Sequence, residues 1–268
     1  MNIDPSPLVF TVINESYMQL GLAWGSRIRA LAQIDPIFIC TDESSFAFFS
    51  EENFPCYLRK SEVPLSCTEK LLYTKSSFPN DKASFTVQQK LHTALYYLRL
   101  GRTIIYSDVD AIWIQNPTVH LPLKECDISF QPGSFPLEAK NLWGFTVCTG
   151  FFHLRPSELT IQLMESALAH FDGSDQRSLN YALLENFQVK WSKRPKDWEH
   201  CRTEGGWTEM IEGLCQRTGL KLAALPHAYY QRHGILPESW RSSIICHPNT
   251  PKDMVQKVAF LRNLGLEL

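Results

Sequence analysis

The feature that most constrains this chain is a short apolar run, Thr103 to Tyr106, that leads into two aspartates, Asp108 and Asp110. β-Branched and aromatic residues in so short a run predict a buried strand of a parallel sheet. Since an unpaired carboxylate is costly to bury, we expect both aspartates at the carboxyl end of the strand, where open α/β sheets bind ligands. Carboxylates separated by one residue can share a divalent cation, which proteins usually hold together with substrate phosphates. The segment therefore predicts a cation site for a phosphate-bearing ligand.

The rest of the chain alternates between strand-like and helix-like segments. Strands are expected at residues 8–13, 36–40, 55–59, 103–106, 127–131 and 244–246, and helices at 17–31, 86–100 and 252–264 and after residues 45, 156 and 172. We expect the second of these helices to begin at a capping box formed by Thr86 and Gln89. Residues 141–156 predict two strand-like pieces around a kink at Thr149 and Gly150, where glycine would let the backbone approach a ligand. The alternation predicts an α/β fold with a doubly wound, mainly parallel central sheet flanked by helices.

Length and charge fit one globular domain. A chain of 268 residues can bury a substantial core, and its formal net charge of -2 gives no general attraction to nucleic acid or anionic membranes. No apolar run approaches the roughly 18–20 residues of a membrane span, and the amino terminus lacks the features of a secretory signal. If the gene product begins at Met1, we expect a cytoplasmic protein. A missing membrane-anchored stem, as in Golgi enzymes, would change that expectation.

The cysteines predict free thiols. None of the eight has Cys-x-x-Cys spacing, so a structural zinc site is not expected. Several, such as Cys40 and Cys246, lie in apolar runs and suit the core as small side chains. The length and spread of the chain do not require disulfides.

Five landmarks occur in an order that is familiar from one family of enzymes. They are Lys90, the Asp-Val-Asp run that ends at Pro117, the block from Cys148 to Pro156, the Asp175-Gln176-x-x-x-Asn180 pattern and His247-Pro-Asn249. In this order they resemble the nucleotide-diphospho-sugar transferases of the GT-A fold. The resemblance is strongest to glycosyltransferase family seventy-seven, which includes plant cell-wall xylosyl- and arabinosyltransferases, and is more distant to glycogenin and bacterial lipooligosaccharide galactosyltransferases. It covers most of the chain except residues 186–241. An Asp-x-Asp pair alone is a weak signal, but five landmarks in order are specific.

The resemblance implies a metal site. Asp108 and Asp110 would hold Mn²⁺ or Mg²⁺ against the donor diphosphate, and His247 matches the third protein ligand. Such a cation neutralises the charge that develops on the departing nucleoside diphosphate. A histidine among carboxylates and phosphate oxygens suits manganese somewhat better than magnesium. A lone histidine after a strand is more often structural, so this role depends on the matched context.

The same resemblance implies a donor-binding set drawn from several strand ends and helices. Its members are Thr11, Asn14, Asp42, Lys90, Gln131, Thr149, Gly150 and Lys252. The first three would hold the nucleoside, Lys90 the sugar or phosphate, the next three the sugar, and Lys252 the phosphates. Lys257 is a rival for the role of Lys252. The alternative for the lysines is a solvated position on a helix, and for the polar residues an ordinary turn.

Asp175 and Gln176 match the pair that faces the anomeric carbon in members that retain the anomeric configuration. Gln176 is a poor nucleophile, and Asp175 is the only nearby candidate in the sequence. A front-face displacement, in which the acceptor hydroxyl attacks beside the departing phosphate, therefore fits better than a double displacement. The alternative is a structural helix terminus, where aspartate caps well.

We expect a single GT-A-like domain over residues 1–268, with three parts. Residues 1–185 are expected to bind the donor, residues 186–241 to lie on the acceptor side, and residues 242–268 to complete the metal and phosphate site. Aromatic residues suited either to the core or to stacking on an acceptor are Trp191, Trp198, Trp207, Tyr229, Tyr230 and Trp240. The expected reaction is transfer of a hexose or pentose, with uridine diphosphate as the favoured carrier, to a hydroxyl of a glycan or protein.

Two other classes of protein remain open. In phosphohydrolases of the haloacid-dehalogenase type, an apolar strand ending in Asp-x-Asp supplies a nucleophile and an acid. That motif normally ends the first strand of its domain and is followed by a late acidic cluster, whereas here it lies mid-chain and the late landmark is His247-Pro248. The other class is a non-catalytic protein that binds a sugar nucleotide or glycan.

Overall fold

The fold is built around one large twisted sheet. The computed structural model describes residues 6–59, 81–195, 207–232, 240–248 and 253–263. Nine strands form the central sheet in the order β3-β2-β1-β4-β7-β6-β10-β9-β8, and three short strands form a second sheet in the order β11-β12-β5. Lys252, Trp198 and most of the expected irregular loop before residue 81 lie outside the described residues.

The first part of the chain alternates between strands and helices as expected. Its elements are β1 (Leu8–Ile13), a 3-10 turn (Glu15–Tyr17), α1 (Met18–Ala32), β2 (Ile37–Cys40), α2 (Glu43–Glu51) and β3 (Cys56–Leu58). The three strands pair in parallel, with Phe10 opposite Ile37 and Phe38 opposite Cys56. Every expected strand and helix of this part is confirmed.

α4 (Asp81–Arg99) crosses from this part of the sheet to β4 (Ile104–Ser107). The helix is longer than expected, and the predicted capping box is wrong because Thr86 lies inside the helix. The Thr86 hydroxyl instead lies 3.2 Å from that of Thr41. β4 pairs in parallel with β1, so the expected strand before the aspartates is confirmed. A turn then leads into β5 (Ile112–Trp113).

β7 (Thr146–Leu154) is one continuous strand, so the expected break at Thr149 and Gly150 is wrong. It runs antiparallel between β4 and β6 (Ile128–Gly133), and α5 (Leu137–Trp143), which no pattern predicted, precedes it. The glycine marks a close approach of side chains to the strand: a Cβ at position 150 would lie 2.2 Å from Cε1 of His247.

Residues after β7 return to the sheet. α6 (Glu158–Ala169) begins at a capping box of Ser157 and Thr160, α7 (Asp175–Ala182) begins at Ser174, and a π-helical turn (Leu183–Phe187) follows. The sheet is then completed by β8 (Val189–Trp191), β9 (Ile211–Cys215) and β10 (Lys221–Ala224). The loosely patterned region thus supplies three strands of the central sheet, while its expected acceptor role stays a prediction.

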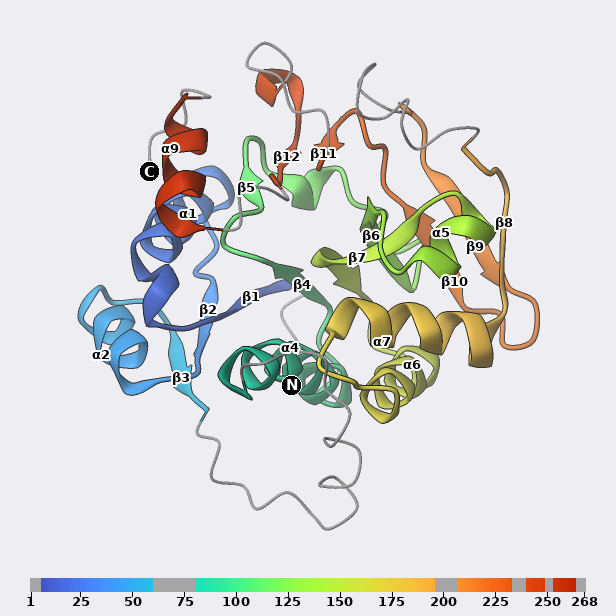
Figure 1. The fold of residues 1–268 in the computed structure, drawn as a ribbon, viewed down its shortest axis with the longest axis horizontal. Helices are drawn as coiled ribbons and strands as arrows, with labels where there is room; N and C mark the ends of the chain where they lie inside the picture. Colours follow the sequence, from blue (N-terminus) through green and yellow to red (C-terminus); the bar gives the residue numbers. More distant parts are fainter. Residues whose placement is uncertain (1–5, 60–80, 196–206, 233–239, 249–252, 264–268) are drawn as a thin grey trace.

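The pairings give seven of the nine strands one direction, since only β7 and β9 oppose their neighbours. The expected mainly parallel sheet is therefore confirmed. The last elements are β11 (Tyr230–Gln231), a 3-10 turn (Trp240–Ser242), β12 (Ile245–Cys246) and α9 (Met254–Asn263), with a further 3-10 turn at Pro117–Val119. The small sheet stands above the carboxyl end of β4 (Figure 1).

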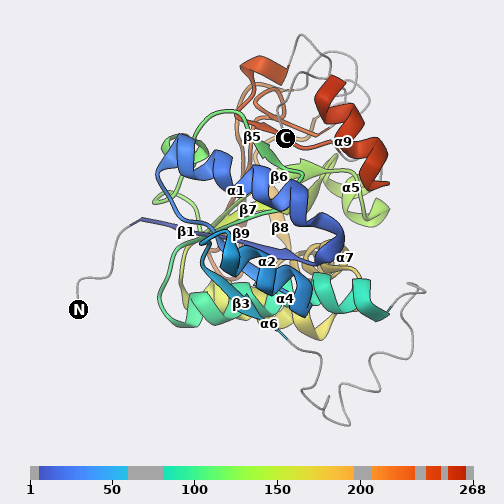
Figure 2. The same ribbon diagram turned by 90° about the vertical axis from the view of Figure 1, so that its left-hand side faces the viewer.

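Helices cover both faces of the sheet. α4 and α6 lie on one face, and α1 and α9 on the other, in both views (Figures 1 and 2). β1 shows why the sequence allows this arrangement: Phe10 packs into the core on the α4 side, whereas Val9 and Ile13 pack on the α1 side. A strand buried on both faces is a continuous apolar run, as the sequence predicted.

Two expectations from composition can be compared with the structure. The six cysteines that it describes are free thiols, and Cys67 and Cys201 lie outside the described residues. In the described part of the chain, no helix has the length and apolarity that crossing a membrane demands.

Candidate active site

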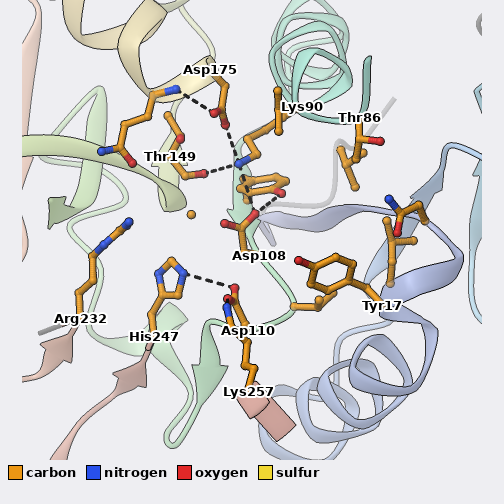
Figure 3. A pocket seen from close by; sticks show the side chains of 18 residues that line it. Tyr17, Thr86, Lys90, Asp108, Asp110, Thr149, Asp175, Arg232, His247 and Lys257 are labelled. Atoms are coloured by element: carbon orange, nitrogen blue, oxygen red, sulfur yellow. Dashed lines mark hydrogen bonds and ion pairs between the residues drawn. The ribbon is translucent and has the colours of Figure 1, made fainter. Parts of the chain in front are cut away.

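A cavity of about 380 Å³ lies at the carboxyl ends of β1 and β4. Its walls come from the segment after β1, from α4, from the middle of β7, from the first turn of α7, and from residues beside β11, β12 and α9 (Figure 3). Parallel strands end at this edge, so it is where an open α/β sheet is expected to bind a ligand. The cavity therefore brings together residues that are far apart in the sequence.

The turn after β4 places the two aspartates in this cavity. The amide of Asp108 donates to the carbonyl of Gly150 (2.7 Å), and the amide of Ala111 donates back to the carbonyl of Asp108 (2.9 Å). Beneath the turn, Ser107 accepts hydrogen bonds from the indoles of Trp24 and Trp113, each at 3.2 Å. Sheet, turn and buried indoles thus fix the backbone from which both carboxylates project.

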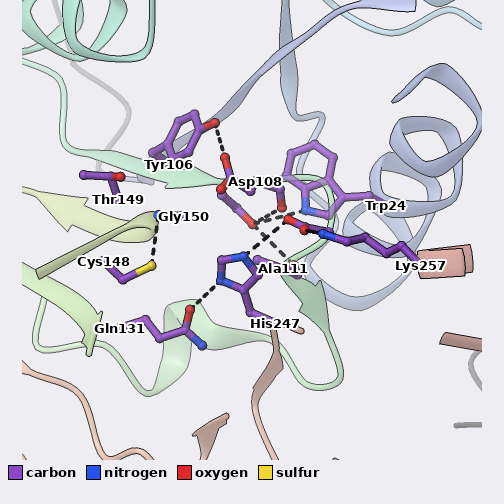
Figure 4. Close-up of polar contacts among 12 residues, drawn as sticks. Trp24, Tyr106, Asp108, Ala111, Gln131, Cys148, Thr149, Gly150, His247 and Lys257 are labelled. Carbon is purple, nitrogen blue, oxygen red and sulfur yellow. Dashed lines mark hydrogen bonds and ion pairs between the residues drawn. The ribbon is translucent and has the colours of Figure 1, made fainter. Parts of the chain in front are cut away.

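Asp108, Asp110 and His247 converge as the sequence resemblance implied. One ligand atom from each lies within 4.8 Å of the others, and Nε2 of His247 is 3.3 Å from Oδ1 of Asp110. Although burial opposes ionisation, His247 when it is protonated, together with Lys257, holds the pKa of Asp110 well below its usual range. Burial lowers the pKa of His247, although Asp110 opposes that shift, and so favours the neutral imidazole that ligates metals. Lys257 forms an ion pair with Asp110 (Figure 3), and Gln131 contacts the other side of the His247 ring (Figure 4).

The side chains of Asp108, Asp110 and His247 suit a divalent cation. Two carboxylates and one neutral imidazole suit Mn²⁺ better than Ca²⁺, and three protein ligands leave positions for phosphate oxygens. Gly150 makes room for the ligands, because a Cβ there would lie 2.7 Å from Oδ2 of Asp108 as well as 2.2 Å from the ring of His247. Every residue except glycine would intrude on this group.

Lys90 joins the aspartates to the opposite wall. Its ammonium lies 3.2 Å from Oδ1 of Asp108 and 2.6 Å from Oδ2 of Asp175, and it donates to the carbonyl of Thr149 (3.0 Å). Burial disfavours this charge, but Asp108 and Asp175 outweigh burial and raise the pKa of Lys90 well above its ordinary value. The hydroxyl of Tyr106 donates to Asp108 at 2.5 Å. Lys90 is therefore a buried, permanently charged group within the cavity and not a solvated helix lysine.

Asp175 and Gln176 enter the cavity from the first turn of α7. The amide of Gln176 donates to Oδ1 of Asp175 (2.8 Å), and the side chain of Gln176 donates to the carbonyl of Phe135 (2.5 Å). Asn180 anchors the helix to β7 through both main-chain groups of Val147. The pair is thus held in place by contacts to two other segments.

The expected donor-binding residues divide into two groups. Asn14, Lys90, Thr149 and Gly150 line the cavity, whereas Thr11, Asp42 and Gln131 are absent from its lining among the described residues. Thr11 is fully buried in β1, and Asp42 caps α2 through Ser45 and accepts the amide of Glu15. Gln131 lies behind His247 and contacts its ring. The donor-binding roles of all these residues stay predictions.

Among the lining residues that were not identified from the sequence, three can carry a charge or donate a hydrogen bond from a long side chain. Tyr17 follows β1, Tyr106 lies in β4, and Arg232 follows β11. Burial raises the pKa of Tyr17, with smaller contributions from Asp110 and Asp108. Tyr17 lies at the end of the short turn that follows the buried strand β1, which was a usable signal, but nothing in the local sequence marked Arg232. Lys257, named only as a rival for Lys252, lines the cavity.

The aromatic candidates for acceptor binding lie elsewhere. The ring of Trp191 packs against Phe130 and Phe145, and Trp240 and Tyr230 belong to the core on the α1 side. Tyr229 is exposed. The structure therefore places most of the described aromatics in the core.

Comparison with known proteins gives a family match over most of the chain. The family described as nucleotide-diphospho-sugar transferase matches residues 33–260. A curated relative, the β-arabinofuranosyltransferase RAY1 of Arabidopsis thaliana, is 23% identical over 171 residues. That match covers 61% of this chain and only 30% of the relative's length.

Several solved structures are similar in part. Mouse xyloside xylosyltransferase 1 in its apo form is 16% identical, with 67% of this chain and 82% of that chain covered and a TM-score of 0.41. The galactosyltransferase LgtC with donor and acceptor sugar analogs is 12% identical, with 65% and 69% covered and a TM-score of 0.42. A glycosyltransferase that acts in glycosylation of the major capsid of PBCV-1 is 9% identical, with 96% and 100% covered and a TM-score of 0.44.

Proposed function

We propose that this chain, which belongs to the nucleotide-diphospho-sugar transferase family, is a metal-dependent retaining glycosyltransferase of the GT-A type. The donor would be a UDP-sugar and the acceptor a hydroxyl of a glycan or protein. The observation that carries the proposal is the convergence of Asp108, Asp110 and His247 in one cavity, with Lys90 linking them to Asp175.

The cavity suits a diphosphate because it combines ligands for a cation with positively charged side chains. Asp108, Asp110 and His247 would hold a divalent cation, which supplies charge neutralisation for the departing diphosphate when bound. Lys257 and Arg232 project into the same half of the cavity and add positive charge toward phosphate oxygens. A diphosphate bound there lies within reach of ammonium and guanidinium donors, whose charge also lowers the energy of the leaving group.

A front-face displacement fits the surroundings of Asp175. Its two oxygens are occupied by the ammonium of Lys90 and the amide of Gln176, which weakens it as a nucleophile. The acceptor oxygen would form its bond to the anomeric carbon on the face from which the bond to phosphate breaks, and its proton would pass to the leaving phosphate. The carboxylate of Asp175, which Lys90 holds in place, would then stabilise the positive charge on the sugar. Trapping a glycosylated Asp175 from donor alone would contradict this mechanism.

The contacts of Asp108 weigh against a phosphohydrolase of the haloacid-dehalogenase type. That chemistry needs the first aspartate as a nucleophile, whereas Asp108 accepts a hydrogen bond from Tyr106 and pairs with Lys90. The family match also favours transfer of a sugar.

The test is release of nucleoside diphosphate from a panel of UDP- and GDP-sugars, with Mn²⁺, Mg²⁺ or a chelator. The panel includes UDP-arabinofuranose, since the curated relative is a β-arabinofuranosyltransferase. We expect slow, metal-dependent hydrolysis of one donor, reduced about 100- to 1,000-fold in Asp110→Ala because charge on the leaving group is no longer stabilised. Asp35→Ala, which removes an exposed carboxylate, is the control. Hydrolysis that is unchanged by the chelator and by Asp110→Ala would refute the proposal.

A further inference from the structure

Gln131 is a buried polar residue that belongs neither to the cavity lining nor to the apolar core. It is fully buried in β6, next to the metal-site histidine and outside the cavity lining of the described residues. Its side-chain oxygen lies 2.7 Å from Nδ1 of His247. Its side-chain nitrogen lies 3.0 Å from the carbonyl of Tyr230 and 3.1 Å from that of Gln231. Gln131 therefore spans from β6 to β11 and to the residue that follows β12.

These contacts fix which way the amide points. Carbonyl oxygens only accept hydrogen bonds, so the end of the amide that faces Tyr230 and Gln231 must be the NH₂ group, which has two donors. The oxygen of Gln131 is then directed at His247 and can only accept. Nδ1 of His247 must in turn carry a proton, which makes Nε2 the nitrogen with the free electron pair in a neutral ring.

The tautomer decides whether Nε2 can bind a cation, because this nitrogen faces the carboxylate of Asp110. Oδ1 of Asp110 lies 3.3 Å away, and a carboxylate oxygen and an unprotonated nitrogen repel each other at that separation. The arrangement becomes favourable when a cation is held between them. In the opposite tautomer the proton would lie on Nε2 and donate a hydrogen bond to Asp110. The histidine could then not bind a metal through that nitrogen.

We propose that Gln131 is a positioning residue that fixes the Nδ1-protonated tautomer and the ring orientation of His247, and so prepares this histidine to bind the divalent cation. This inference rests on the function proposed above, and it gives Gln131 a role that needs no contact with the donor sugar. It also ties the metal ligand to β11, whose carbonyls anchor the amide directly before Arg232. The geometry of the cation site thus depends on a residue that touches neither cation nor substrate.

The experiment measures tautomer and metal binding separately in the full chain. Gln131→Met removes the acceptor and both donors while keeping an unbranched side chain, whereas Gln131→Glu keeps an acceptor for Nδ1 and loses the donors. Long-range ¹H–¹⁵N NMR of the metal-free protein identifies the tautomer of His247, assigned with His247→Gln. Titration with Mn²⁺ alone, followed by electron paramagnetic resonance of the free ion, gives the affinity.

Wild type is expected to show the Nδ1-protonated ring. Gln131→Met is expected to lose that single tautomer and to bind Mn²⁺ about 10- to 100-fold more weakly, the usual effect of removing such a partner. Gln131→Glu is expected to recover most of the affinity. Ser129→Ala is the matched control, since Ser129 lies in the same strand, is equally buried and contacts another histidine, His153, at 3.3 Å.

The outcomes separate this inference from the proposed function. Unchanged Mn²⁺ affinity in Gln131→Met, or an Nε2-protonated ring in wild type, would overturn the role of Gln131 and leave the transferase proposal intact. Gln131→Glu as weak as Gln131→Met would also overturn it, because an acceptor for Nδ1 would then make no difference to metal binding. Wild type that does not bind Mn²⁺ would overturn the proposed metal dependence and this inference with it.

Discussion

At the scale of single residues, Gly150 has the least freedom to change. A Cβ at this position would lie 2.2 Å from Cε1 of His247 and 2.7 Å from Oδ2 of Asp108, the two residues proposed above as metal ligands. We expect Gly150→Ala to displace the imidazole and lower metal-dependent donor hydrolysis about 100-fold, as misplacement by about 1 Å can do. Gly219→Ala is the control: nothing lies within 4 Å of the added carbon, although the positive φ of Gly219 (+81°) strains any side chain there. Equal loss of activity in both variants would contradict the steric argument.

The residue scale also shows what sequence could and could not predict about the site. Asp108 and Asp110 were identifiable because carboxylates directly after a buried strand have few structural explanations. The glycine was expected to let the backbone approach a ligand, which stays a prediction; the structure shows close approach of His247 and Asp108 instead. Arg232 had no local signal, because its place in the cavity depends on the pairing of β11 with β12. Contacts that depend on such non-local pairing are not encoded in any short pattern.

At the scale of elements, Asn180 replaces a missing sheet partner. Val147 of β7 stands opposite Pro132 of β6, while β4, on the other side of β7, pairs only with Phe151–Leu154 and does not reach Val147. The side chain of Asn180 on α7 instead accepts from the amide of Val147 (2.9 Å) and donates to its carbonyl (2.8 Å). Asn180→Ala would leave both groups buried and unpaired, so we expect the free energy of unfolding to fall by about 2–4 kcal/mol. Urea unfolding measures the change, and Asn186→Ala, at an exposed amide, should change it by less than about 0.5 kcal/mol.

Elements were predicted well where one pattern continued over a whole segment. α1 and β1 have clear 3.6-residue and continuous apolar patterns, and both were expected within a residue or two of their bounds. β9 was missed, although its alternation of buried Ile211, Gly213 and Cys215 with exposed residues is the pattern of a half-buried strand. β7 was divided in two because a glycine inside a strand resembles a break. The glycine serves the site beside the strand, which only the assembled sheet reveals.

At the scale of the whole molecule, the stability of the folded state should depend on pH through a histidine that does not line the cavity. His153 is fully buried in β7, and burial, with a smaller contribution from Arg155, lowers its pKa from 6.5 to about 4. Between these values the unfolded chain binds a proton that the folded chain does not, so stability is complete above pH 6.5 and falls as pH drops toward 4. The loss from this group is on the order of 3 kcal/mol.

Urea unfolding at pH 7.5, 5.5 and 4.5 compares this loss in wild type and His153→Gln, which should lose less stability over the same range. His170→Gln provides a control of opposite sign. Although burial opposes the charge of His170, its contacts with Ser166 and Glu185 raise its pKa, so it stabilises the folded state below its unfolded pKa and that stabilisation disappears as pH rises. Removing it should therefore steepen the loss in acid. The His153→Gln variant removes the only titratable group at its position. If the free energy of unfolding fell equally with pH in wild type and His153→Gln, the acid sensitivity would therefore arise from other groups.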